Sequence, residues 1–81
     1  MTKEEVFLKV VDILNKYNKS DVSADKISME TSILEDLKIN SARLVDIVLD
    51  FEDAFDIEVD DDDADRVVTV GDGVNLILSK I

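Results

Sequence analysis

The chain has 81 residues, of which 46% are hydrophobic, and this length predicts one domain spanning residues 1–81 with a single core of modest size. It contains no Cys and no His, which excludes a disulfide framework, a thiolate metal site and catalysis by a cysteine nucleophile or a histidine base. The net charge of −11 opposes binding to nucleic acid or to an anionic membrane and favours partners with positive surfaces, unless it serves solubility alone.

A first helix is predicted close to the N-terminus. Thr2 and Glu5 have the spacing of a capping box, in which each side chain satisfies a backbone N–H of the other residue. No apolar signal segment is present and no run approaches the roughly 18 apolar residues of a membrane span, so we expect a cytoplasmic protein without membrane insertion. The apolar face of this helix comprises Val6, Phe7, Val10, Val11, Ile13, Leu14 and, at the edge of the core, Tyr17.

Residues 18–32 are polar and lack periodicity, which predicts a long connection. A loop of this length in a small domain is either functional or covers the core, and we favour covering. Val22, Ile27 and Met29 are its expected apolar anchors. A tight turn with the polar shoulder Glu35–Asp36 then leads to the second helix, and its apolar residues are Ile33, Leu34, Leu37 and Ile39.

The second helix is predicted over about residues 41 to 55, with Ser41 in its first turn. At 100° per residue its core residues fall within a sector about 100° wide, and Asp46, Asp50 and Asp53 fall on the opposite side. The core residues of this helix are Leu44, Ile47, Val48, Phe51 and Phe55.

Beside the acidic side of this helix, Ala42, Val45 and Leu49 form an apolar strip at i, i+3 and i+7. An exposed apolar strip flanked by carboxylates suits a partner patch rimmed by Arg and Lys. Alternatively, Val45 and Leu49 cover loop residues of their own domain. The sequence leaves both interpretations open.

The C-terminal third predicts a short helical turn in the acidic run 60–65 and a last helix capped by Thr69, with Asp72 in its first turn. Gly71 and Gly73 weaken the start of that helix by about 1 kcal/mol each relative to Ala. The expected fold is all-α: a small bundle of three main helices plus one short helix. The apolar stripe of the last helix is Val70, Val74, Ile77, Leu78 and Ile81.

Neither catalysis nor a calcium site is favoured. A serine nucleophile lacks a histidine base, and a Ser–Lys pair with Lys38 requires a desolvated lysine in a pocket. The Asp run imitates the first EF-hand ligands, but Arg66 occupies the position that needs Gly and Asp72 the position that needs Glu. We therefore expect no enzyme activity, no catalytic residues and no specific metal site.

Three segments together resemble the acyl carrier protein family: Glu35–Leu37, Asn40–Ala42 with the helix continuing to Val59, and Arg66–Val70 before the last apolar stripe. The resemblance covers nearly the whole chain and implies a carrier fold. It implies that Ser41 receives 4′-phosphopantetheine from coenzyme A and that acyl groups ride as thioesters on the thiol of that arm. Ser41 alone would be interpreted as an ordinary N-cap; the surrounding match favours the attachment site.

The same resemblance implies partners: a phosphopantetheinyl transferase, and acyl synthases or acyltransferases with basic docking patches. We expect the chain to be a monomer and its second helix to dock on them. The expected partner-binding residues are Asn40, Ala42, Arg43, Val45, Asp46, Leu49, Asp50, Glu52 and Asp53. The candidate acyl-chain lining is Leu44, Val48, Phe51, Ile57 and Val74.

The attachment motif departs from the usual Asp-Ser-Leu, which commonly follows a Gly. Asn40 removes a negative charge, Ala42 removes a large apolar contact, and Arg43 adds a positive charge. Together these changes weaken enzyme recognition by about 2–4 kcal/mol if each contact has an ordinary interface value. They predict a specialised carrier for a lipid or related biosynthetic pathway. The alternative is an unmodified acidic carrier-fold protein that acts as an interaction or regulatory module.

Overall fold

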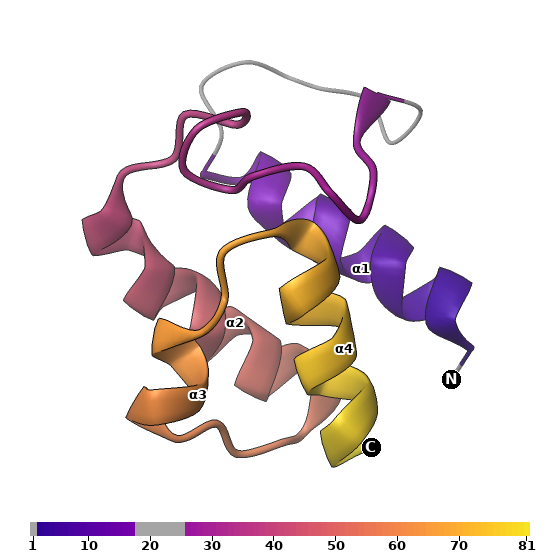
Figure 1. The fold of residues 1–81 in the computed structure, drawn as a ribbon. Coiled ribbons are helices and arrows are strands. Elements are labelled where there is room, and N and C mark those ends of the chain that lie inside the picture. Colours follow the sequence, from indigo (N-terminus) through magenta and orange to yellow (C-terminus); the bar gives the residue numbers. More distant parts are fainter. Residues whose placement is uncertain (1, 18–25) are drawn as a thin grey trace.

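The computed structural model describes residues 2–17 and 26–81. Within these ranges it is helical, with one isolated antiparallel bridge between Ser32 and Thr69, so the expected three main helices and one short helix are confirmed. None of the described helices is long and apolar enough to cross a membrane. The elements are α1 Lys3–Asn15, the 3₁₀ turn η2 Ser41–Arg43, α2 Leu44–Phe55, α3 Asp61–Asp65 and α4 Val70–Lys80 (Figure 1).

Both predicted helix starts are confirmed as complete capping boxes. Thr2 Oγ1 accepts from the Glu5 N–H and Glu5 Oε1 accepts from the Thr2 N–H, each over 3.2 Å. At α4, Thr69 Oγ1 accepts from the Asp72 N–H at 3.1 Å, and Asp72 Oδ2 accepts from the N–H groups of Thr69 and Val68 at 3.0 and 3.1 Å. These backbone hydrogen bonds lower the pKa of Glu5 and of Asp72, because they stabilise the ionised carboxylate.

The core lies between α1, α2 and α4, with α4 packed mainly on α1 (Figure 1). Phe51 of α2 is fully buried in this core. At the C-terminal end the expected stripe is only partly correct: Leu78 is half-buried and Ile81 is 51% exposed, because α4 ends at Lys80. The buried apolar side chains of the helices are Val6, Val10, Val11, Ile13, Leu14, Ile47, Val48, Phe51, Phe55, Val70, Val74 and Ile77.

The described part of the connection before α2 covers the core, as expected. Ile27, Ile33, Leu37 and Ile39 are buried and Met29 is half-buried. Val22 lies outside the described residues.

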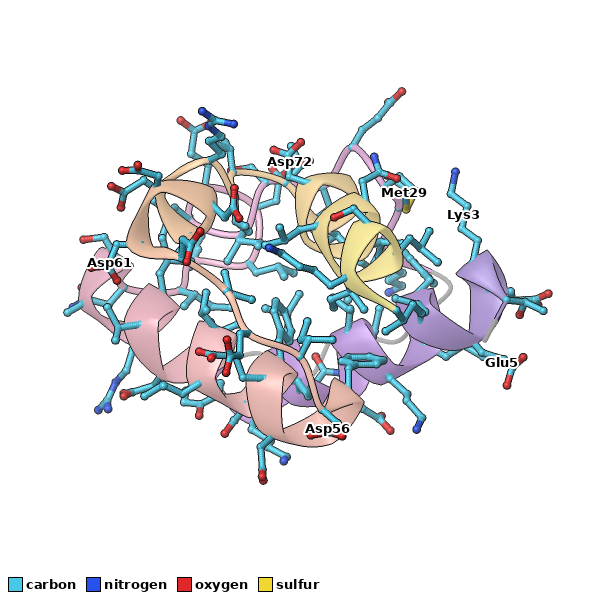
Figure 2. All side chains as sticks on the ribbon, turned by 90° about the horizontal axis from the view of Figure 1, so that it is seen from below. Lys3, Glu5, Met29, Asp56, Asp61 and Asp72 are labelled. Carbon is cyan, nitrogen blue, oxygen red and sulfur yellow. The ribbon has the colours of Figure 1, made fainter. Side chains whose placement is uncertain are left out.

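Backbone hydrogen bonds hold this connection to the start of α4. The N–H of Val70 donates to the carbonyl of Thr31 at 2.9 Å, and the N–H of Gly71 donates to the carbonyl of Met29 at 2.8 Å. Met29 lies beside the first turns of α4 (Figure 2). The segment that leads to Ser41 is therefore fixed by the last helix of the chain.

Candidate functional site

Ser41 is the first residue of η2, directly before α2. The expected helix over 41–55 therefore begins with a 3₁₀ turn, and its α-helical part starts at Leu44. Buried Ile39 anchors the chain two residues before Ser41, and the side chain of Ser41 itself is exposed. The serine is consequently held at a fixed place on the surface.

Asn40, not Ser41, caps this helical segment. Asn40 Oδ1 accepts from the Ala42 N–H at 3.0 Å, and the Arg43 N–H donates to the Asn40 carbonyl at 2.8 Å. Within the described part of the chain the Ser41 hydroxyl makes no hydrogen bond. The ordinary N-cap interpretation of Ser41 is therefore wrong.

A phosphodiester fits at Ser41. The positive end of the helix dipole favours a phosphate here, although the N–H groups of Ala42 and Arg43 are already bonded to Asn40, and exposure gives a modifying enzyme access. The preceding Lys38 has a left-handed backbone with φ 55°, which turns the chain into η2. Its side chain is exposed, so it lacks the desolvated pocket that a Ser–Lys nucleophile requires.

The apolar strip on α2 faces solvent. Val45 is 64% exposed and Leu49 is 56% exposed, and Ala42 is exposed as well. More than half of each side chain is therefore left uncovered by the domain, although both also border Val59 of the loop before α3. An apolar strip of this kind, next to Ser41 and flanked by carboxylates, is available to a partner.

The carboxylates beside the strip differ in their surroundings. Asp46 pairs with Arg43 at 3.3 Å on the surface, and Asp53 is exposed. Asp50 Oδ2 accepts a hydrogen bond of 2.6 Å from the hydroxyl of Tyr17, beyond the end of α1. Sequence reasoning missed this contact, because the two residues are 33 positions apart and Tyr17 has the spacing of a core residue.

The candidate acyl-chain lining is already packed. Val48, Phe51 and Val74 are buried, while Leu44 and Ile57 are half-buried against the core. Of these five, Val48 borders a small cavity of about 80 Å³ between α2 and α3, whose other walls include Val45, Leu49, Glu52, Val59, Asp61 and Ala64. Asp61, the first residue of α3, lies beside α2 at this cavity (Figure 2).

The acidic run forms the short helix α3, not the ligand loop of an EF-hand. Asp63 in this helix pairs with Lys80 of α4 at 3.3 Å. Among the described residues, no group of three or more acidic side chains is arranged to hold a metal ion. The helical backbone of the run differs from that of an EF-hand ligand loop.

Comparison with known proteins identifies the family. A family model described as "Phosphopantetheine attachment site" matches residues 9–77. The acyl carrier protein of Thermotoga maritima is 39% identical over 80 residues, covering 99% of this chain and 96% of the relative. That of Picosynechococcus sp. is 39% identical over 77 residues, covering 95% of this chain and 93% of the relative.

A solved structure agrees with these relatives. The acyl carrier protein from Enterococcus faecalis superposes with a TM-score of 0.82 at 38% sequence identity, and the match covers 100% of both chains. These relatives are carriers, so the family evidence supports the carrier interpretation over the unmodified interaction module and over an enzyme. The chain therefore belongs to the acyl carrier protein family, a family of carriers rather than catalysts whose prosthetic group is 4′-phosphopantetheine.

Proposed function

We propose that this chain carries acyl intermediates as thioesters on a 4′-phosphopantetheine arm attached to Ser41, in a specialised lipid or related biosynthetic pathway in the cytoplasm. Carriers of this family interact with a phosphopantetheinyl transferase and with acyl-handling enzymes. The arm supplies the terminal thiol, which this cysteine-free chain lacks.

One observation supports this proposal most: the side chain of Asn40 caps the helical segment, whereas the side chain of Ser41 does not. Asn40 caps the helical segment through Oδ1, so the hydroxyl of Ser41 is not needed for folding. That hydroxyl is exposed at the positive end of the helix dipole, which favours a phosphate ester. The chain thus keeps the serine of the motif free for modification without loss of helix stability.

The exposed strip gives the carrier a docking surface. Val45 and Leu49 offer apolar contact area beside Glu52 and Asp53, a combination that suits a basic patch with an apolar centre. The surface starts next to Ser41, so an enzyme that docks there has its active site close to the arm. We infer that the transferase and the acyl-handling enzymes share this surface.

Sheltering an acyl chain between the helices requires α2 and α3 to separate. The cavity beside Val48 measures about 80 Å³, room for only a few methylene groups. Phe51 and Val74 are fully buried in the core, where side chains are close-packed. The α2–α3 boundary is the natural place to open, because α3 is a short helix with no fully buried residue.

Transfer of the arm in vitro tests the attachment site. The purified chain is incubated with coenzyme A and a phosphopantetheinyl transferase, and its intact mass is measured. We expect one arm on the native chain, none on Ser41→Ala, and one on the matched control Ser79→Ala, an exposed serine whose hydroxyl bonds the Leu76 carbonyl at 2.7 Å. An arm on Ser41→Ala would contradict the assignment.

The double variant Asn40→Asp/Ala42→Leu tests specialisation. It restores the usual Asp-Ser-Leu motif, and Asp caps a helix as well as Asn, so the stability of the chain should not change. We expect a transferase from a general fatty-acid pathway to modify this variant at least about tenfold faster than the native chain, in line with two restored interface contacts. Equal rates would show that the native motif does not restrict recognition.

A further inference from the structure

The side of α2 that faces α1 holds the shortest side-chain contact described in the molecule. The Tyr17 hydroxyl donates to Asp50 Oδ2 over 2.6 Å, and both side chains are half-buried. Hydrogen bonds to an ionised carboxylate are stronger than those between neutral groups. The same contact raises the pKa of Tyr17, because the hydrogen bond to the nearby carboxylate disfavours the phenolate.

The neighbouring pair between Arg43 and Asp46 is of a different kind. Its side chains are 62% and 46% exposed and the shortest N–O distance is 3.3 Å. Exposed ion pairs of this geometry contribute little and exchange readily with water or with a partner. Asp46 therefore remains available for binding, whereas Asp50 is already engaged.

We propose that Tyr17 is a specificity-determining positioning residue of the docking surface: it holds Asp50 toward α1, so that Asp53 and Glu52 carry the short-range contacts to a basic partner. This inference rests on the proposed function, since it assumes that α2 docks on enzymes. Asp53 lies one turn after Asp50 on the same helix, is exposed, and has no hydrogen bond or ion pair among the described residues.

The contact also restricts the kind of donor that Asp50 accepts. The phenol uses one lone pair of Oδ2, so an arginine that bonds both oxygens of Asp50 must approach from the side away from Tyr17. The charge of Asp50 still adds to the long-range attraction of a basic surface. The partner that fits has basic side chains opposite Asp53 and Glu52 and an apolar centre opposite Val45 and Leu49.

The test is a double-mutant cycle on the reaction of the full chain with coenzyme A and a phosphopantetheinyl transferase. The variants are Tyr17→Phe, Asp50→Asn and their combination, with Asp53→Asn as the matched control. The amide oxygen introduced by Asp50→Asn can still accept the hydrogen bond from Tyr17, so this change removes charge and keeps the contact. The KM for the carrier is measured at several salt concentrations, and the melting temperature reports on folding.

We expect Asp50→Asn to change the KM by less than about twofold in the native background, and Asp53→Asn to raise it about threefold to tenfold, as for a contact at a docking surface. In Tyr17→Phe the released Asp50 should lower the KM and steepen its salt dependence, and adding Asp50→Asn should reverse both effects. A purely structural role of Tyr17 would move the melting temperature without this reversal.

Two results would overturn the inference. One is an Asp50→Asn effect on the native KM as large as that of Asp53→Asn. The other is a Tyr17→Phe variant whose KM and salt dependence equal those of the native chain. Failure of the proposed function has a separate signature, because the native chain would then receive no arm, or Ser41→Ala would receive one.

Discussion

The two helical glycines of α4 have opposite roles, although helix propensity alone predicts that both weaken the helix equally. A Cβ at Gly71 would lie 2.7 Å from the Met29 carbonyl oxygen, a backbone atom that cannot move aside by changing a rotamer. A Cβ at Gly73 would meet the Phe51 ring at 3.5 Å, an ordinary contact. Gly71 is therefore required by the close approach of the connection, and Gly73 is not.

We expect Gly71→Ala to lower the free energy of unfolding by about 1–3 kcal/mol, because the connection must shift to admit a methyl group. Its matched control, Gly73→Ala, should raise the free energy of unfolding by up to about 1 kcal/mol through higher helix propensity. Urea unfolding of the two variants measures both. If both changes destabilise the chain equally, the Met29 carbonyl does not lie as close to Gly71 as described.

Asp56 ends α2 in a left-handed conformation with φ 54°. Glycine adopts this conformation without strain, and the Asp carboxylate also lies at the negative end of the helix dipole. We expect Asp56→Gly to raise the free energy of unfolding by about 1 kcal/mol. Asp56→Asn should raise the free energy of unfolding only by the contribution of the removed charge, about 0.3–1 kcal/mol. A loss of stability in Asp56→Gly would contradict the C-cap assignment.

At the scale of elements, the sequence predicted what depends on neighbouring residues. The capping box of α1, the Thr69 cap of α4 and the core face of α2 were found, because the partners lie within one or two turns. The exposure of Ile81 was not predicted, since periodicity gives the direction of a side chain but not whether another element covers it. The contact of Tyr17 with Asp50 and the need for Gly71 depend on segments far apart in the sequence, which local patterns do not pair.

The capping box of α4 predicts a pH dependence. The backbone hydrogen bonds from Thr69 and Val68 lower the pKa of Asp72 in the folded chain below its unfolded value of about 3.9. Asp72 therefore contributes stability above that value, and the contribution is lost as the pH falls through the lower folded pKa. Asp72→Asn keeps an accepting oxygen and removes the charge. We expect it to be less stable than the native chain at about pH 7.

The stability difference between Asp72→Asn and the native chain should shrink as the pH is lowered from about 5 to below 3. Thermal unfolding of both proteins across this range measures it. As a control, Asp62→Asn changes an exposed carboxylate at the start of α3 that makes no capping bond. If the Asp72→Asn difference is independent of pH, the ionised carboxylate does not stabilise the cap.

At the scale of the whole molecule, the charge is divided unevenly along the chain. Residues 1–26 contain five basic and five acidic residues, whereas residues 27–81 contain four basic and fifteen acidic residues. The net charge of −11 thus belongs entirely to the part that forms η2, α2, α3 and α4. Repulsion among these carboxylates opposes compaction, and screening by salt relieves it.

We expect the melting temperature to rise between low salt and about 0.5 M NaCl, and to rise also with millimolar Mg²⁺. A gain of about 1 kcal/mol corresponds to about 4–8 °C for a domain of this size. The double variant Asp61→Asn/Asp62→Asn removes two charges from the acidic part and should show a smaller salt effect. A melting temperature indifferent to salt would contradict the picture of clustered, repelling carboxylates.

The family and the carrier fold could be predicted from the sequence, because motif and periodicity extend over nearly the whole chain. The absence of a capping hydrogen bond at the Ser41 hydroxyl could not be predicted, since it depends on Asn40 acting as the N-cap. The attachment of the arm to Ser41 is tested most directly by the intact mass of the protein purified from its native source, with fragmentation to locate any modification. We expect an added mass of one 4′-phosphopantetheine arm on Ser41. An unmodified chain, or an arm on another residue, would contradict it.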